Sequence, residues 1–172
     1  MEIVRRIFDE ALVIKLRSRI DNRGMMTAAY EESFRETGFV PKETRVYTMT
    51  EKGTFFGIHF RDKSSPMSKL VAVIRGRGAD YIVDLRKDSS TYLKWEKIEL
   101  SAENALAVLI PAGLGHGFQA LEDDTIQLYS IDRSGDDGYS RTCSYLDERI
   151  GLKPDIPVTA ISDYDIKAEL YK

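Results

Sequence analysis

Residues 110–118 read IPAGLGHGF, and this stretch decides the fold that the sequence predicts. Pro111 and Gly113 are typical of a turn, and the residues after them are predicted to enter a strand. Successive side chains of a strand point to opposite faces of a sheet. The stretch therefore predicts that a turn and a strand together aim the imidazole of His116 at one face.

Strand-like runs recur on both sides of this stretch. Between Thr44 and Ile131, β-branched and aromatic residues return at intervals of roughly ten residues, separated by Gly, Asp, Ser and Pro. About eight antiparallel strands of this length predict an all-β jelly roll, in which two sheets fold together. The expected strands lie near 44–50, 54–61, 69–75, 79–86, 92–98, 105–110, 115–121 and 125–131.

The two ends of the chain are predicted to add short elements to this jelly roll. Residues 2–20 resemble one or two strands, and residues 21–24 (DNRG) have the composition of a turn. Residues 28–37 predict a short amphipathic helix that stops at Gly38. A second short helix is predicted near Asp163, with Ser162 as its cap. No linker or repeat divides the chain, so we expect one domain over residues 1–172.

Composition excludes some classes of function. Of 172 residues, 42% are hydrophobic and 31% are charged, and the formal net charge is −3. An acidic chain without a basic run is a poor candidate for binding a nucleic acid polymer, although one pyrophosphate needs only a few basic groups. The N-terminus lacks the apolar run of a signal peptide, and no long apolar segment follows. We expect a cytoplasmic protein that does not contact a membrane.

The chain has only two histidines, His59 and His116. Pro-x-Gly-x-x-His before a strand resembles the second motif of the cupin superfamily, a group of small β-barrels. Metal-binding cupins usually add a His-x-His pair, but His59-Phe60-Arg61 stands here. Two imidazoles and an arginine form a poor site for a divalent cation, so we expect no metal. Each histidine could also be a packed structural residue.

Alternation along the strands groups the candidate side chains. On strand 54–61, His59 is predicted to share a face with Gly57 and Arg61. On strand 79–86, Asp84 is predicted to share a face with Asp80. Such mixed faces are typical of a barrel with a ligand in its interior, and equally of a sandwich with polar residues facing solvent.

Further motifs run in order along the chain. They are Arg23-Gly24 after Asp21, Gly57-Ile58-His59, Lys69-Leu70-Val71, residues 84–92 (DLRKDSSTY), residues 110–118, Leu128-Tyr129 and residues 161–165 (ISDYD). Over about 20–165 the chain resembles the dTDP-4-dehydrorhamnose 3,5-epimerase family. The resemblance implies a cupin jelly roll, a homodimer, and a reaction without metal or organic cofactor.

The resemblance also implies a reaction, which is epimerisation at C3 and/or C5 of a 4-keto (6-deoxy) nucleotide-diphosphate sugar. His59 is the implied general base, and Asp165 is the carboxylate that pairs with it. Lys69 is implied to offer its ammonium to the enolate oxygen, and Tyr129 to return a proton from the opposite side.

The remaining residues of the resemblance are implied to bind the substrate. His116, held by Asp84, would line the site and support a substrate oxygen. Arg23 would contact the pyrophosphate or the sugar of the nucleotide. We expect Phe56 and Arg61 to lie beside the substrate as well.

Some positions depart from the family pattern. Phe56 stands where the family usually has an arginine, and Arg61 where it usually has a glutamine. Thr44 and Val46 fall at about the positions of a glutamine and an asparagine that meet the nucleotide. These departures predict a different nucleotide sugar, with inversion at C3 alone or C5 alone as options. A sugar 3,4-ketoisomerase and a non-catalytic sugar-binding cupin remain as alternatives.

Overall fold

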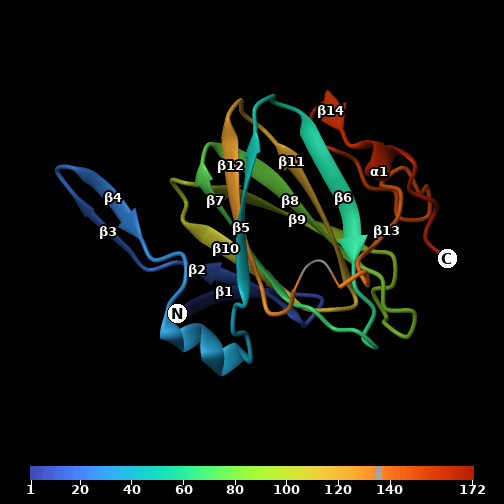
Figure 1. The fold of residues 1–172 in the computed structure, drawn as a ribbon, viewed down its shortest axis with the longest axis horizontal. Coiled ribbons are helices and arrows are strands. Elements are labelled where there is room, and N and C mark those ends of the chain that lie inside the picture. Colours follow the sequence, from blue (N-terminus) through green and yellow to red (C-terminus); the bar gives the residue numbers. More distant parts are fainter. Residues whose placement is uncertain (135–136) are drawn as a thin grey trace.

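Two β-sheets packed on each other form the body of the protein (Figure 1). The computed structural model describes residues 1–134 and 137–172. The first sheet has the strand order β1-β2-β10-β7-β12-β5, and the second has the order β13-β6-β11-β8-β9, with β14 paired to β6. The first sheet comprises β1 (Glu2–Ile7), β2 (Ala11–Lys15), β5 (Glu43–Met49), β7 (Lys69–Arg75), β10 (Leu106–Ile110) and β12 (Thr125–Ile131). The second comprises β6 (Thr54–Phe60), β8 (Arg77–Asp84), β9 (Trp95–Ser101), β11 (Leu114–Ala120), β13 (Arg141–Thr142) and β14 (Ala160–Ile161).

This arrangement is a jelly roll, so the predicted fold class is confirmed. Consecutive strands such as β7 and β8 lie in different sheets and are joined across Gly76. All eight strands predicted between 44 and 131 are present, and β7 and β12 have the predicted bounds. The largest error is at β9, which begins at Trp95 instead of residue 92. The segment before it is a turn in which Leu93 has a positive φ of 62°, so it cannot continue a strand.

Apolar side chains fill the space between the sheets and cover their outer faces. Val71, Ile82 and Phe118 belong to a buried cluster to which both sheets contribute. A second cluster includes Ile150 and Leu152 of the C-terminal segment, which is turn-rich as predicted but also supplies core residues. Burying a side chain of this kind contributes about 1.5–3 kcal/mol. The C-terminal segment is thereby held against the body of the protein.

The predicted terminal helices are present but short. The N-terminal one is a 3-10 helix, η1 (Glu32–Thr37), which ends at Gly38 with a φ of 82°. The C-terminal one is α1 (Asp163–Ile166), in which Ser162 Oγ accepts a hydrogen bond of 3.1 Å from the backbone N–H of Asp165. None of the described helices has the length and apolar character to span a membrane.

A separate hairpin projects from the body (Figure 1). Its strands β3 (Ser18–Asp21) and β4 (Gly24–Thr27) pair with each other and with neither large sheet. The predicted turn at residues 21–24 joins them. The side chains of Ile20 and Met26 are 78% and 65% exposed. The hairpin therefore carries apolar surface that its own chain does not cover.

The pairing of β6 with β11 positions the two histidines. His59 lies opposite His116, and the register shifts between His116 and Phe118. At this point Gly57 has a φ of 104°, and a Cβ there would lie 2.5 Å from the carbonyl oxygen of His116. Only glycine combines this conformation with so close an approach of the two strands.

We expect Gly57→Ala to destabilise the protein by at least about 1–3 kcal/mol, because it adds a steric clash to an unfavourable φ. Gly138→Ala is the matched control, since Gly138 has a φ of 79° but no atom within 4 Å of the added Cβ. Denaturant unfolding of the three proteins measures the difference. Equal losses in the two variants would contradict the requirement for close approach at Gly57.

Candidate active site

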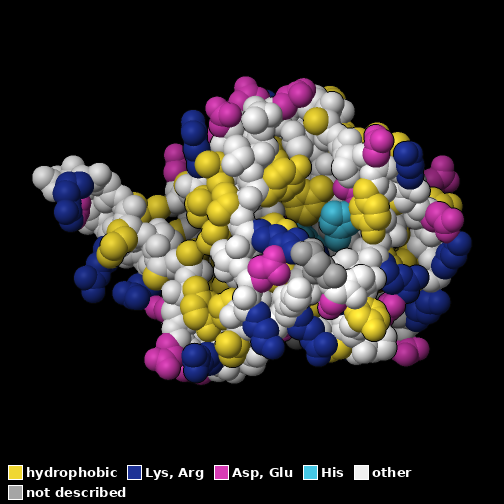
Figure 2. Space-filling view, viewed as in Figure 1, with side chains coloured by type: hydrophobic (Ala, Val, Ile, Leu, Met, Phe, Trp, Pro, Cys, Tyr) yellow, Lys and Arg dark blue, Asp and Glu magenta, His cyan; other side chains and the backbone are white. Residues whose placement is uncertain are grey.

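A cavity of about 410 Å³ opens between the two sheets. This volume lies in the range of small-molecule sites. Figure 2 shows its mouth, where histidine and hydrophobic side chains surround a hollow. The described lining residues come from β5, β6, β7, β11, β12, β14 and α1 and are Tyr47, Thr54, Phe55, Phe56, His59, Lys69, His116, Gln127, Tyr129, Ala160, Ile161, Ser162 and Asp165. Six of the nine residues predicted for the site are among them.

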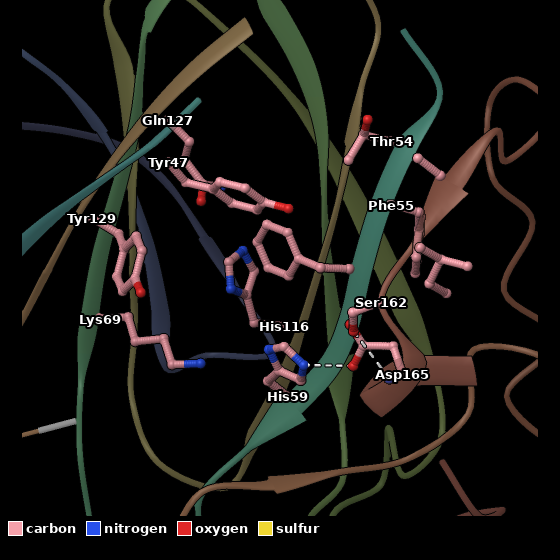
Figure 3. Close-up of a pocket in the computed structure, with 13 residues that line it drawn as sticks. Tyr47, Thr54, Phe55, His59, Lys69, His116, Gln127, Tyr129, Ser162 and Asp165 are labelled. Atoms are coloured by element: carbon pink, nitrogen blue, oxygen red, sulfur yellow. Dashed lines mark hydrogen bonds and ion pairs between the residues drawn. The ribbon is translucent and has the colours of Figure 1, made fainter. Parts of the chain in front are cut away.

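His59 and Asp165 form a hydrogen-bonded pair at one side of the cavity (Figure 3). His59 Nε2 lies 2.6 Å from Asp165 Oδ1. Ser162 Oγ donates to Asp165 Oδ2 at 3.1 Å, and Thr142 Oγ1 donates to Oδ1 at 3.3 Å. Burial alone would raise the pKa of Asp165, but the hydrogen bonds, above all that from His59, hold it below its usual value. The ionised carboxylate therefore accepts the Nε2 proton, which leaves His59 Nδ1 as the basic nitrogen.

His116 has a different partner from the predicted one. Its Nε2 lies 2.9 Å from Asp80 Oδ2, and both side chains are buried. The prediction that Asp84 holds His116 is wrong. In the register of β8 and β11, His116 lies opposite Ile82, so Asp80 and Asp84 are both diagonal neighbours. Asp84 is engaged elsewhere, and Asp80 takes the contact.

Asp84 has a structural role at the end of β8. Its carboxylate accepts hydrogen bonds from Arg86 at 2.8 and 2.7 Å, and from Ser89 and Thr91 at 2.6 Å each. Although burial opposes ionisation, these donors hold the pKa of Asp84 far below its usual value. Asp84 does not line the cavity. It anchors the turn that separates β8 from β9, so the prediction of a substrate contact is corrected to this role.

Burial lowers the pKa of two further groups. It lowers the pKa of His116, although the carboxylate of Asp80 opposes this shift, so His116 is a neutral imidazole at neutral pH. Burial also lowers the pKa of Lys69 to about 8. Most Lys69 side chains therefore still carry a positive charge at pH 7.

Lys69 and Tyr129 lie on the opposite side of the cavity from His59 (Figure 3). They come from the paired strands β7 and β12, whereas His59 comes from β6. Arg45 lies directly opposite Tyr129 in the pairing of β5 with β12, and Glu43 together with the Tyr129 hydroxyl raises the pKa of Arg45. Arg45 was missed by the sequence analysis, because its place beside Tyr129 follows only from the register of β5 on β12.

Phe56 lies in the cavity, as predicted, but its neighbours are aromatic. Its ring stacks on His59 at a centroid distance of 5.7 Å and on Phe118 at 5.8 Å. The same ring meets His116 edge-on at 5.4 Å. Phe56 and His59 thus share a face although they are three residues apart. Strict alternation fails here because the register of β6 on β11 is irregular.

Arg61 is not beside the cavity. Its side chain is buried and donates to Asp137 at 3.0 Å and to Ser140 at 3.2 Å. The prediction that Arg61 lies beside the substrate is therefore corrected, since its guanidinium is bound to Asp137 and Ser140 beyond the end of β6. A minor effect remains, because its charge contributes to the lowered pKa of Lys69.

Arg23 lies at the turn of the projecting hairpin, away from the cavity of its own chain. Its guanidinium pairs with Asp21 at 2.7 Å and is largely exposed. Arg23 is not among the described residues that line the cavity of its own chain.

The described residues contain no group of three or more His, Cys, Asp or Glu side chains placed to hold a metal ion. Each histidine is hydrogen-bonded to one carboxylate, and the ring of Phe56 packs beside both. Acid–base chemistry by side chains is what this arrangement supports.

The family model for dTDP-4-dehydrorhamnose 3,5-epimerase matches residues 6–172. The chain belongs to this family. The dTDP-4-dehydrorhamnose 3,5-epimerase of Methanothermobacter thermautotrophicus is 35% identical over 157 residues, which cover 90% of this chain and 83% of the relative. The family prediction made from the motifs is thus confirmed.

Solved structures agree with this membership. The dTDP-4-dehydrorhamnose 3,5-epimerase of Bacillus anthracis, with TDP and PPi bound, superposes with a TM-score of 0.90 at 31% identity and covers 98% of both chains. A 3'-monoepimerase from Streptomyces bikiniensis, in complex with dTDP-quinovose, has a TM-score of 0.87 at 29% identity, over 94% of this chain and 84% of that one. The prediction that this epimerase-family chain acts at C3 and/or C5 of a 4-keto nucleotide sugar is confirmed.

We expect Asp84→Asn to lower the free energy of unfolding by about 1–3 kcal/mol near pH 7, because it weakens the hydrogen bonds from Arg86, Ser89 and Thr91, while Arg86 keeps Glu10 as a partner. The pKa of Asp84 is lowered in the folded state, so its stabilisation is full above the ordinary value of 3.8 and is lost as the pH falls through the folded pKa. The gap between wild type and variant should therefore shrink below about pH 4.

Denaturant unfolding at several pH values measures this gap. Asp88→Asn is the control, because Asp88 is an exposed residue of the same turn. A gap that stays constant down to pH 2, or one that Asp88→Asn reproduces, would contradict the role of the Asp84 carboxylate.

Proposed function

We propose that this family member epimerises a nucleotide-linked 4-keto-6-deoxyhexose by removing a proton on one face of the sugar and returning one on the other. The observation that carries the proposal is the placement of the His59–Asp165 pair across one cavity from Lys69 and Tyr129. Experiment decides whether the configuration is inverted at C3 alone, at C5 alone or at both carbons.

His59 removes the proton from the carbon beside the ketone. Because Asp165 accepts the proton on Nε2, Nδ1 presents a lone pair to the cavity. The C–H electron pair becomes the enolate double bond, and the carbonyl electrons move to oxygen. The imidazolium that forms is stabilised by the Asp165 carboxylate. A positioned base of this kind accelerates proton transfer by about 10²–10⁴-fold.

Lys69 stabilises the enolate oxygen. Its ammonium extends into the cavity toward the histidines (Figure 3). A charge that is already oriented and poorly hydrated needs no reorganisation when the enolate forms. His116 has a separate role, because Asp80 accepts its Nε2 proton and leaves Nδ1 as an acceptor for a substrate hydroxyl.

Tyr129 returns the proton on the opposite face. Its O–H bond breaks, a new C–H bond forms, and the enolate electrons return to the ketone. The phenolate left on Tyr129 lies next to the Arg45 guanidinium, which stabilises the negative charge. Inversion follows because His59 and Tyr129 belong to opposite walls of the cavity.

The functional unit of this proposal is a homodimer. The hairpin of β3 and β4 exposes Ile20 and Met26, and β5 is an edge strand of the first sheet with Val46 61% exposed. These apolar surfaces lie on separate parts of the chain, and the hairpin points away from its own sheets (Figure 1). A second copy can cover both at once. In such a dimer the hairpin of one subunit brings its Arg23 toward the cavity of the other.

Solvent deuterium should enter C3 or C5 of a dTDP-4-keto-6-deoxyhexose when the wild-type protein is present, and the product should be inverted at that carbon. His59→Asn should lose both exchange and inversion, because no base remains. Tyr129→Phe should keep exchange and lose inversion, because His59 can return a deuteron to its own face. Proton NMR in D₂O measures both events. Tight binding of the sugar nucleotide by wild type without any exchange would instead support a non-catalytic binding protein.

The paired substitution Ile20→Asp with Met26→Asp should convert the dimer to a monomer, because it places charge on the apolar hairpin surface. Size-exclusion chromatography with light scattering measures the mass. Leu146→Asp is the control, since Leu146 is similarly exposed (68%) but lies far along the chain in the C-terminal segment. A wild-type monomer, or a variant that stays dimeric, would contradict the proposed assembly.

A further inference from the structure

Gln127 is a buried amide in the cavity wall that makes no hydrogen bond. Among the described buried side chains, the atoms without a hydrogen-bond partner are Tyr30 Oη, Asp80 Oδ1 and both Oε1 and Nε2 of Gln127. Gln127 is 0% exposed and lines the cavity. Buried polar groups are rarely left unpaired, and each such group calls for an explanation.

A second buried glutamine, Gln119, has a structural role and serves as a comparison. Gln119 on β11 is also 0% exposed, but its Nε2 donates to the carbonyl of Ile156 at 2.8 Å, and its Oε1 accepts from the N–H of Ile156 at 3.2 Å. Gln119 therefore ties the C-terminal segment to the second sheet. Gln127 makes neither kind of contact, so structure alone does not explain its amide.

The position of Gln127 relates it to the reacting groups. It lies two residues before Tyr129 on β12, so both side chains point to the same face, about 7 Å apart along the strand. Figure 3 shows Gln127, Tyr129 and Lys69 on the same side of the cavity. Its neighbours across the strand are Tyr47 on β5 and Val73 on β7. A hexose whose reacting carbon lies at Tyr129 would present another part of its ring to Gln127.

Depth in the cavity favours the sugar over the nucleotide as the occupant at Gln127. Gln127 and His116 are both buried, whereas Tyr47 and His59 are partly exposed near the mouth. Among the described lining residues Lys69 is the single lysine or arginine, and the proposed reaction uses it at the ketone. The charged pyrophosphate has no further cation to meet at this depth, so the neutral hexose is the part of the substrate that fits here.

The chemistry of the amide selects a hydroxyl group. A primary amide offers an N–H donor and a carbonyl acceptor side by side, and a hydroxyl likewise donates and accepts. A hydrogen or a methyl group in its place would displace water from the amide and leave it unpaired. Such a loss changes an equilibrium constant by about 5- to 150-fold.

We propose that Gln127 is a specificity-determining residue that binds the hydroxyl group at C2 or C3 of the hexose, on the evidence of its buried, unpartnered amide in the cavity wall. The inference rests on the proposed function, since it takes a nucleotide sugar as the ligand. It adds to that function a reason for this chain to prefer sugars that carry the hydroxyl.

The test uses unreactive ligands, so that its outcome does not depend on turnover. Calorimetry gives the affinities of dTDP-6-deoxyglucose, of its 2-deoxy and 3-deoxy forms, and of dTDP alone. Wild type should bind the hydroxylated sugar about 5- to 150-fold more tightly than one of the deoxy forms. Gln127→Met should reduce that preference to near one and leave the affinity for dTDP unchanged.

Two further measurements separate this role from a structural one. Gln127→Met should unfold at a higher temperature than wild type without ligand, because it removes an unpaired buried amide, whereas Gln119→Met should unfold at a lower one. Gln119→Met should keep the wild-type preference among the sugars. Gln127→Leu serves as a second variant if the methionine does not fold.

Three results would overturn the proposal. They are a wild type without preference for a hydroxylated sugar, a Gln127 variant that keeps the preference, and a Gln127 variant that weakens dTDP alone as much as the sugar nucleotide. A failure of solvent exchange with the preference intact would instead overturn the proposed reaction and leave the role of Gln127 standing.

Discussion

The pairing of β6 with β11 is the constraint on which the site depends. It brings His59 opposite His116, and the close approach at Gly57 lets Phe56 and His59 enter the same cavity. β14 then pairs with β6 and delivers α1, from which Asp165 reaches the imidazole of His59. A shift of this pairing by one residue would turn every side chain of β6 to the other face.

The two imidazoles show how environment assigns different chemistry to the same side chain. His59 is partly exposed and is oriented by a carboxylate that has its own hydrogen bonds. His116 is buried, and burial lowers its pKa so that it is neutral despite the nearby Asp80. One imidazole is therefore suited to take up a proton and the other to accept a hydrogen bond.

The cavity wall opposite His59 carries the ammonium of Lys69 and the phenol of Tyr129. Lys69 lines the cavity, and Arg45 lies opposite Tyr129 on the neighbouring strand. Aromatic rings fill much of the remaining wall, so a polar group there has few partners of its own. That setting strengthens each electrostatic contact with a substrate and makes an unpaired amide such as Gln127 conspicuous.

The sequence by itself determined the fold class, the family and most of the residues proposed to react, because turn chemistry and strand alternation are local properties and the motifs occur in family order. His59, Lys69, His116, Tyr129 and Asp165 were predicted from these motifs and line one cavity.

Tertiary structure alone decided which neighbours each residue meets. Both Asp80 and Asp84 are diagonal neighbours of His116 across the strands. Asp80 binds His116, because Asp84 accepts hydrogen bonds from the turn after β8. Arg45 and Gln127 gain their significance only from the register of β12 and from burial, which depend on strands far apart in the chain. Arg61 lies outside the cavity wall because β6 ends at Phe60 and the Arg61 guanidinium pairs with Asp137, a residue far along the chain.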